Sequence, residues 1–425
     1  MSLSSSSMKK HMITLISFSL LTLVSVIGFV TADLKGGIIQ RSGLGFVDDI
    51  GNPFTVQGAN MYWHMVQGAS PSTRNFVDAV YSDAQTLGLN VIRTWAFNDG
   101  TTDGALQTAP GVYDESVFQA LDYAVAEAAK YNIRLIMSLV NNFDNYGGRS
   151  QYAKWAVDEG EVMPNTDFFY NNTLTRTWYK NHVKTVLSRV NTITGVAYQD
   201  DPAIFGWELI NEAQCQSDVS GNTLAAWVEE MASYVKSIDG KHLLEIGLEG
   251  YYGSSTPDRI SVNPLSYNGY GTDFIRLNQI ANINFASVHS YPDTWLPDKS
   301  DDEKLSFLQT WMNQHIKDAT DTLNMPVMFC EFGKSDKVSG YQPQMREQLY
   351  STVYNSVYSS ITKGGGGAGT LFWQLLPKGM ESWDDGFGVF ASDSPLVSTI
   401  NSQSSRLTKF MASKSTKSRR RLLFW

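Results

Sequence analysis

Eight short apolar runs, most of them followed by a longer stretch with helical periodicity, constrain this chain most strongly. Runs of this length that alternate with amphipathic helices are typical of parallel strands in an α/β fold. The predicted strands are Thr55–Met61, Asn90–Ala96, Ile133–Val140, Ile204–Ile210, Leu243–Leu248, Phe285–His289, Val327–Glu331 and Thr370–Gln374. Eight such runs without a low-complexity linker predict a single (β/α)8 TIM barrel.

The segments between these runs support the barrel. Apolar residues recur at three- and four-residue spacings in Ser116–Tyr131, Leu224–Ile238 and Met345–Ile361, which predicts helices with one buried face. Before the first strand, Leu44–Phe54 is predicted as a short N-terminal β-hairpin that plugs the bottom of the barrel. Gly364–Gly367 lacks the Lys-Ser/Thr of a phosphate-binding loop, so we interpret it as a helix terminator and flexible connector.

The two ends of the chain differ from its body. Residues 1–32 combine two lysines, an apolar stretch and small residues before Asp33, which is the pattern of a secretory signal peptide. A transmembrane anchor is the alternative, since the apolar stretch is near membrane length. We expect a secreted protein with a folded domain over 33–412, a basic, mobile tail over 413–425, and no membrane association after signal cleavage.

Charge and cysteine content exclude several classes of function. The formal net charge is −9, whereas nucleic-acid binding requires a clustered cationic surface, so no nucleic-acid partner is expected. Two cysteines are too few for a disulfide framework. The six histidines show no metal-ligand spacing, and no nucleotide fingerprint precedes a helix. We therefore expect no metal and no cofactor.

Polar and aromatic residues gather where the predicted strands end, which is the active-site face of a (β/α)8 barrel. Any single carboxylate there has an ordinary explanation as a structural ion pair. Such residues at all eight strand ends are better explained by a catalytic cleft. They are Asn60, Trp63, Arg93, Trp95, Asn141, Asn142, Asn211, Glu212, Glu249, His289, Tyr291, Glu331 and Trp373.

Two of these carboxylates, Glu212 and Glu331, end the fourth and seventh predicted strands, which lie roughly opposite each other around the barrel. Glycoside hydrolysis needs two carboxyl groups that flank one bond. We expect Arg93 and Tyr291 to keep Glu331 ionised as the nucleophile. Glu212 is expected to be protonated when substrate arrives, and to act as the base once a covalent glycosyl-enzyme has formed.

Several ordered motifs resemble glycoside hydrolase family 5, and within it the plant endo-β-mannanases. Trp207–Glu212 resembles the acid/base motif and Glu331–Gly333 the nucleophile motif, while Val91–Phe97, Val288–Pro292 and Leu371–Gln374 also match. The resemblance spans roughly the whole mature chain. It implies an extracellular, retaining, endo-acting hydrolase that cuts internal β-1,4 bonds in the mannan, galactomannan and glucomannan of cell walls.

The resemblance also implies which residues contact the sugar. Asn211 would hydrogen-bond the substrate 2-hydroxyl, and Trp373 would form the stacking floor at the cleavage site. The remaining substrate-binding residues would be Trp95, Tyr291, His289 and Arg93.

One departure from the family pattern is Ala213-Gln214, where Pro-Arg is usual after the acid/base residue. We expect the missing proline to loosen the turn that aims Glu212, and the missing guanidinium to remove a bidentate donor near the cleft. Two alternatives stay open. One is a family 5 β-glucanase, because the same carboxylate pair serves either sugar, and the other is a mannan-binding protein with impaired turnover.

The cysteines and one Asn-X-Ser/Thr site carry the remaining predictions. Strand alternation is expected to turn Cys330 away from the face that carries Glu331, as a buried core thiol, and it argues against a disulfide with Cys215. Asn171 lies in a polar segment before a helix, where glycosylation is allowed.

Overall fold

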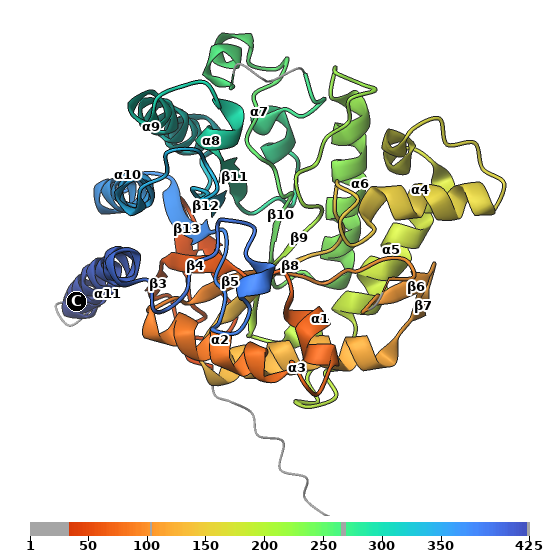
Figure 1. The fold of residues 1–425 in the computed structure, drawn as a ribbon, viewed down its shortest axis with the longest axis horizontal. Helices are drawn as coiled ribbons and strands as arrows, with labels where there is room; N and C mark the ends of the chain where they lie inside the picture. Colours follow the sequence, from red (N-terminus) through yellow and green to blue (C-terminus); the bar gives the residue numbers. More distant parts are fainter. Residues whose placement is uncertain (1–33, 103, 265–268, 423–425) are drawn as a thin grey trace, which may run out of the picture. The chain divides into compact units, whose positions relative to one another are not determined.

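The computed structural model describes residues 34–102, 104–264 and 269–422, so the predicted signal peptide lies outside the described residues. Its main sheet has eight parallel strands, in the order β10-β9-β8-β5-β4-β13-β12-β11 (Figure 1). They are β4 (Val56–Asn60), β5 (Val91–Trp95), β8 (Arg134–Ser138), β9 (Ile204–Glu208), β10 (Leu243–Glu245), β11 (Ala286–Ser290), β12 (Val327–Phe332) and β13 (Gly367–Phe372). Each of the eight predicted strands overlaps one of these, although β13 begins three residues before the predicted start and β10 ends three residues before the predicted end.

Backbone hydrogen bonds connect the two edge strands. The N–H of Asn284 donates to Leu244 O at 2.8 Å, and the N–H of His289 donates to Glu249 O at 3.0 Å. These bonds bring β10 beside β11, so the sheet closes into the predicted barrel.

Helices surround this barrel, and most of them bury apolar residues against the strands or against neighbouring helices (Figure 1). They are α1 (His64–Ala69), α2 (Asn75–Thr86), α3 (Glu115–Lys130), α4 (Gly148–Asp158), α5 (Thr173–Leu187), α6 (Asn222–Ile238), α7 (Phe274–Asn278), α8 (Pro292–Trp295), α9 (Asp301–Asp318), α10 (Pro343–Lys363) and α11 (Ser394–Leu422). Local signals set their ends: Ser300 and Glu303 form a capping box at the start of α9. None of the described helices is long and apolar enough to span a membrane.

A small antiparallel sheet closes the lower end of the barrel, as predicted for Leu44–Phe54. It contains β1 (Gln40–Ser42), β2 (Gly45–Val47) and β3 (Pro53–Phe54). Phe46 on β2 is buried, and its ring packs edge-on against Phe205 at 5.2 Å and Phe285 at 5.8 Å between centroids. The hairpin thus contributes an aromatic side chain directly to the barrel interior.

The glycine run and the C-terminal segment differ from expectation. Gly364 ends α10 with φ +78°, as predicted, but Gly367 already belongs to β13. A Cβ on Gly366 would lie 3.1 Å from the Cβ of Ala319, so close packing explains this glycine better than flexibility does. The last helix, α11, continues to Leu422 and includes most of the segment predicted as a tail, whose mobility stays a prediction.

Candidate active site

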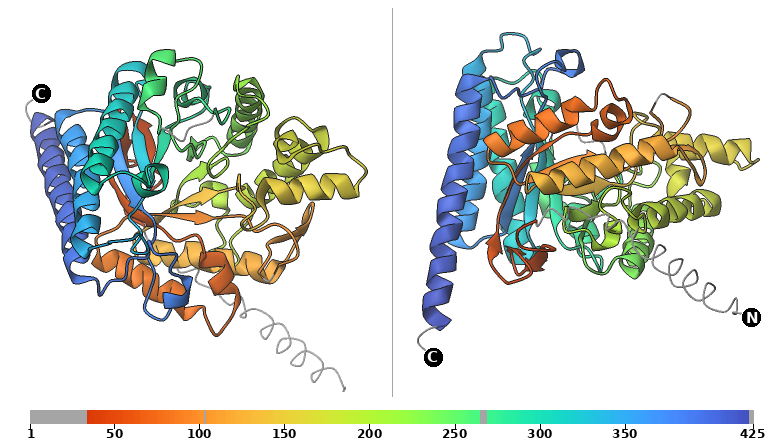
Figure 2. Two further views of the ribbon diagram at one scale, coloured as in Figure 1. Left: turned by 45° about the horizontal axis from the view of Figure 1, so that its top comes forward. Right: turned by 90° about the horizontal axis from the view of Figure 1, so that it is seen from below.

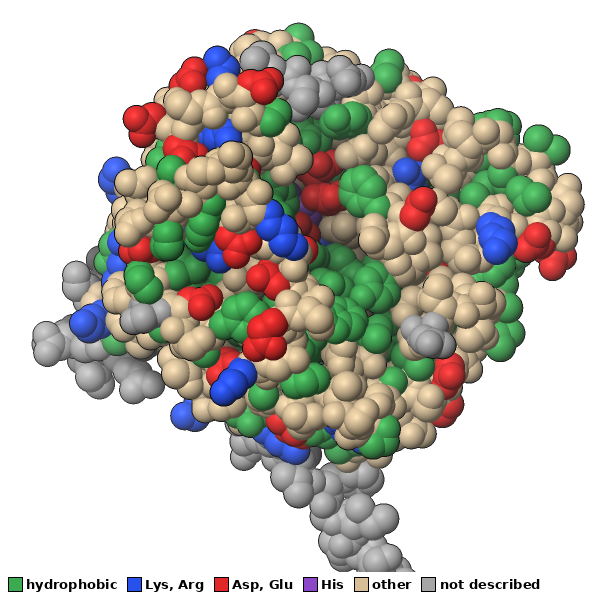
Figure 3. All heavy atoms as spheres, viewed as in Figure 1, with side chains coloured by type: hydrophobic (Ala, Val, Ile, Leu, Met, Phe, Trp, Pro, Cys, Tyr) green, Lys and Arg blue, Asp and Glu red, His purple; other side chains and the backbone are tan. Residues whose placement is uncertain are grey.

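A cleft of about 540 Å³ opens where the strands of the barrel end. Figure 3 shows this face hollowed at its centre, with acidic side chains deep in the hollow and apolar ones around it. Six of the eight residues predicted to be catalytic or sugar-binding contribute to the cleft wall: Trp95, Asn211, Glu212, Tyr291, Glu331 and Trp373. The structure therefore brings both predicted catalytic carboxylates into one cavity.

Glu212 and Glu331 lie close enough to act on one bond. One oxygen of each carboxylate and a ring nitrogen of His289 all lie within 4.8 Å of one another. Inverting glycosidases separate their carboxyl groups by about 6.5–9.5 Å to admit a water, whereas retaining ones hold them about 5–5.5 Å apart. The arrangement is therefore that of a double-displacement enzyme, in which one carboxylate attacks the sugar directly.

Arg93 lies beneath the cleft, and its predicted role as a sugar contact is wrong. The side chain is fully buried, and five hydrogen bonds use its five N–H groups. Nε donates to Glu208 (2.5 Å), Nη1 to Asn60 (3.0 Å) and Glu331 (2.6 Å), and Nη2 to Glu208 (2.8 Å) and Asn211 (2.7 Å). Arg93 instead fixes the position of Glu331 and Asn211.

Tyr291 completes the immediate contacts of Glu331 by donating from its hydroxyl to Oε2 at 2.7 Å. Burial raises the pKa of Glu331 above its usual value, and Glu212 adds to this, while His289 and Arg93 oppose it. The two predicted partners of Glu331 are thus in place. They offset part of the cost of burying this carboxylate, whose pKa still lies above its usual value.

His289 is fully buried and contacts Glu212, so it positions the acid/base residue from below and does not line the cleft. Its Nδ1 lies 2.6 Å from Glu212 Oε1 and 3.7 Å from Glu331 Oε2. Burial lowers the pKa of His289, but Glu331 and Glu212 outweigh this effect and raise it above its ordinary value. The contact with His289 therefore fixes the position of the Glu212 carboxyl group. These three side chains also have the spacing of a metal site, and the absence of a metal stays a prediction.

The turn that carries Glu212 is held firmly although the usual proline is missing. Glu212 has φ +55°, a strained conformation for this residue type that the surroundings must hold in place. Its N–H donates to Gly247 O at 2.7 Å, and the N–H of Asn211 donates to Val140 O at 2.9 Å. The expectation of a loosened turn is therefore not supported, because neighbouring strand ends hold the backbone on both sides.

The aromatic floor of the cleft includes residues that the sequence prediction missed. Tyr62 stacks on Trp373 with ring centroids 5.3 Å apart and planes 4° apart, and Tyr146 packs edge-on against Tyr62. The indole Nε1 of Trp373 donates to Asp385 at 2.7 Å. Trp373 is therefore fixed as a platform by Tyr62 and Asp385. Tyr62 follows the first strand by two residues, which was an available signal.

Cys330 is a buried free thiol, as predicted. The strand alternation on which that prediction rested is interrupted at this residue. A register shift pairs Val288 with Phe329 and His289 with Glu331, so Cys330 is the extra residue of a β-bulge. Its Sγ lies in the barrel interior, 3.9 Å from Glu245 Oε1. Burial raises the pKa of this thiol, and Glu245 adds to the effect. The thiol is thus kept in its unreactive form.

Gln214, which occupies the place of the family arginine, binds another carboxyl group in the cleft. Its Nε2 donates to Glu249 Oε2 at 2.6 Å. Burial raises the pKa of Glu249 to about 8, and the charge of Glu212 adds to this, while Gln214 opposes it. With an amide in place of a guanidinium, Glu249 stays protonated over most of the neutral range.

This raised pKa predicts how stability changes with pH. Between about pH 4.5 and about pH 8 the folded protein keeps the Glu249 proton that the unfolded chain loses, so stability falls as the pH rises. We expect Glu249→Gln, which stays neutral, to reduce this fall by about 1–3 °C in melting temperature. Thermal unfolding at pH 5 and pH 8 measures the difference.

Glu229→Gln serves as the matched control, because Glu229 is exposed on α6. It should reproduce the pH dependence of the unchanged protein. An identical pH dependence for Glu249→Gln would show that Glu249 is already ionised at neutral pH.

Known proteins resemble this chain over most of its length. Residues 37–386 match the family model described as GH family 5 beta-mannosidase-like. Mannan endo-1,4-beta-mannosidase 1 of Oryza sativa subsp. japonica is 50% identical over 89% of this chain and 87% of its own length. Mannan endo-1,4-beta-mannosidase 5 of Solanum lycopersicum is 50% identical over 84% of this chain and 86% of its own.

Solved structures agree with the fold. The endo-1,4-beta-mannanase from Rhizomucor miehei has a TM-score of 0.73 and 32% identity, covering 88% of this chain and 99% of that one. The endo-beta-1,4-mannanase from Thermotoga petrophila has a TM-score of 0.71 and 30% identity, covering 83% and 76%.

Proposed function

Because the chain belongs to the β-mannosidase-like group of glycoside hydrolase family 5, we propose that it hydrolyses internal β-1,4 bonds of mannan with retention of configuration. The observation that carries the proposal is the pair Glu212 and Glu331, with oxygens within 4.8 Å in an aromatic cleft. Galactomannan and glucomannan are the proposed natural substrates.

The first step is attack of a Glu331 oxygen on the anomeric carbon. The bond to the leaving sugar breaks while Glu212 gives its proton to the departing oxygen. Arg93 and Tyr291 hold Glu331 in line, each through one hydrogen bond to a different oxygen. Trp373 provides the apolar face on which the sugar lies.

In the second step Glu212 removes a proton from water, which attacks the anomeric carbon and releases Glu331. The His289 contact at 2.6 Å keeps the Glu212 carboxyl aimed at the same point in both steps. His289 is therefore a positioning residue. It keeps its hydrogen bond to Glu212 while that carboxyl group loses and regains its proton.

A polysaccharide panel tests the substrate. We expect reducing ends to appear at least about tenfold faster from unbranched mannan, galactomannan or glucomannan than from carboxymethyl cellulose, because the cleft must distinguish the configuration at C2. The products should be several sugars long. Cleavage of cellulose alone would favour the β-glucanase alternative, and release of monomer alone would contradict internal cutting.

The alternative of a binding protein with impaired turnover has little support from the site. The turn after Glu212 is held by backbone hydrogen bonds, and both carboxylates have their partners. We further propose that the protein is secreted to the cell wall after loss of residues 1–32, with glycan attached at the exposed Asn171. The mass of the secreted protein before and after glycosidase treatment tests both points.

A further inference from the structure

Helix α11 has a charge opposite to that of the rest of the protein. From Ser394 to Trp425 the sequence contains seven Lys and Arg and no Asp or Glu, although the whole chain has a net charge of −9. Figure 2 shows α11 lying against α10 along one side of the barrel. A cationic element on an acidic protein is an electrostatic footprint for an anionic partner.

The inner face of α11 accounts for its attachment to the barrel but not for its charge. Ile400 and Leu407 are buried, and the hydroxyl of Ser404 donates to Leu87 O at 2.8 Å. The exposed basic residues of the described part are Lys409 and Lys414. Neither forms an ion pair with a described residue, so their charge is available to a ligand.

Arg406 adds a guanidinium held in a fixed position. It stacks on the Tyr358 ring at 4.4 Å, and its Nη1 donates to Asn355 Oδ1 at 2.8 Å. No described residue accepts a hydrogen bond from its Nη2. Arg406 is thereby prearranged, without an acidic partner, one turn of helix away from Lys409.

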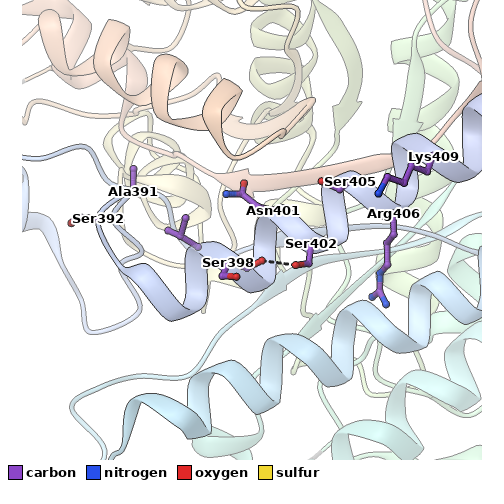
Figure 4. A pocket seen from close by; sticks show the side chains of 9 residues that line it. Ala391, Ser392, Ser398, Asn401, Ser402, Ser405, Arg406 and Lys409 are labelled. Carbon is purple, nitrogen blue, oxygen red and sulfur yellow. Dashed lines mark hydrogen bonds between the residues drawn. The ribbon is translucent and has the colours of Figure 1, made fainter.

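A shallow pocket of about 690 Å³ lies over this part of α11 (Figure 4). Besides Arg406 and Lys409, its wall carries hydroxyl and amide groups from Ser392, Ser398, Asn401, Ser402 and Ser405. None of the residues that line it is acidic. Hydroxyl and amide groups beside cations match a ligand that carries both hydroxyls and carboxylates. The pocket wall is too polar for insertion into lipid.

We propose that α11 is a docking surface for a carboxylated polysaccharide, a polyuronate, with Arg406 and Lys409 binding carboxylates and the pocket binding ring hydroxyls. Mannan carries no charge, so a cationic helix adds nothing to binding of the proposed substrate. The surface would instead hold the enzyme on an acidic polymer that surrounds that substrate. This inference does not depend on which bond the active site cuts.

Binding of the full chain to immobilised polygalacturonate tests the proposal. We expect retention that disappears between about 0.05 and 0.5 M salt, because exposed charges are screened over this range. Lys409→Glu combined with Lys414→Glu should weaken binding at least about tenfold at low salt. Hydrolysis of soluble mannan should be unchanged in this variant. Unchanged hydrolysis would also show that the variant is correctly folded.

Lys154→Glu combined with Lys184→Glu is the matched control, since both residues are exposed on other helices and the change in net charge is the same. It should weaken binding less than about twofold. Equal weakening in both variants would overturn the proposal in favour of a general charge effect. Equal binding to the methyl-esterified polymer, or tighter binding to phosphatidylserine vesicles, would overturn it as well.

Discussion

Glu331→Ala is expected to lower kcat on mannan by at least about 10⁴-fold, because no covalent intermediate can form without this carboxylate. The protein should remain folded and should still bind manno-oligosaccharides, since Arg93 keeps both bonds to Glu208 and the aromatic platform is untouched. Steady-state kinetics and calorimetric binding measure the two effects separately.

Adding azide to the Glu331→Ala and Glu212→Ala variants tests the two catalytic roles separately. In Glu331→Ala the ion can occupy the space of the lost carboxylate and attack the anomeric carbon, which yields a glycosyl azide of inverted configuration. In Glu212→Ala, azide instead intercepts the covalent intermediate and yields retained configuration. Reversed stereochemistry would exchange the two roles, and unchanged activity of Glu331→Ala would eliminate this residue as the nucleophile.

Arg93→Met should have the largest combined effect on stability and activity. It leaves Glu208 and Glu331 buried without their cation, which costs about 3–5 kcal/mol of unfolding free energy. It also releases Glu331 and Asn211 from their positions, so kcat should fall by about 10³-fold. Urea unfolding and steady-state kinetics are the measurements.

Two further variants separate stability from positioning. Arg93→Lys restores the charge but not the five-donor fork, so part of the stability should return while kcat stays low. Arg189→Met removes the cation beside the buried Asp122 outside the cleft, so it should lower stability with little change in kcat. If Arg93→Met kept normal kcat, Arg93 would be a purely structural residue.

The carboxylate pair and its barrel were predictable because the signals are local. Each apolar run is one strand. Glu331 lies near the end of β12, and Glu212 follows shortly after the end of β9. The role of Arg93 was not predictable, since it depends on which groups surround the guanidinium. Glu208 was the available clue, because a charged residue inside an apolar strand needs a buried partner.

Other features depend on contacts between distant segments. The bulge at Cys330 arises from pairing between β11 and β12, which strand alternation within one run cannot reveal. The turn at Glu212 is held by Gly247 and Val140, and the Trp373 platform by Asp385 from an irregular loop. Periodicity carries no information about such loops.

The pairing of β4 with β13 has a consequence for how the chain folds. The first barrel strand finds one of its two neighbours only at Gly369–Phe372, more than 300 residues later. Ser404 on α11 then closes over Leu87. During synthesis one edge of β4 therefore stays unpaired until nearly the whole chain has left the ribosome. Such long-range closure makes folding slow, and a chain interrupted before β13 exposes unpaired strands to aggregation.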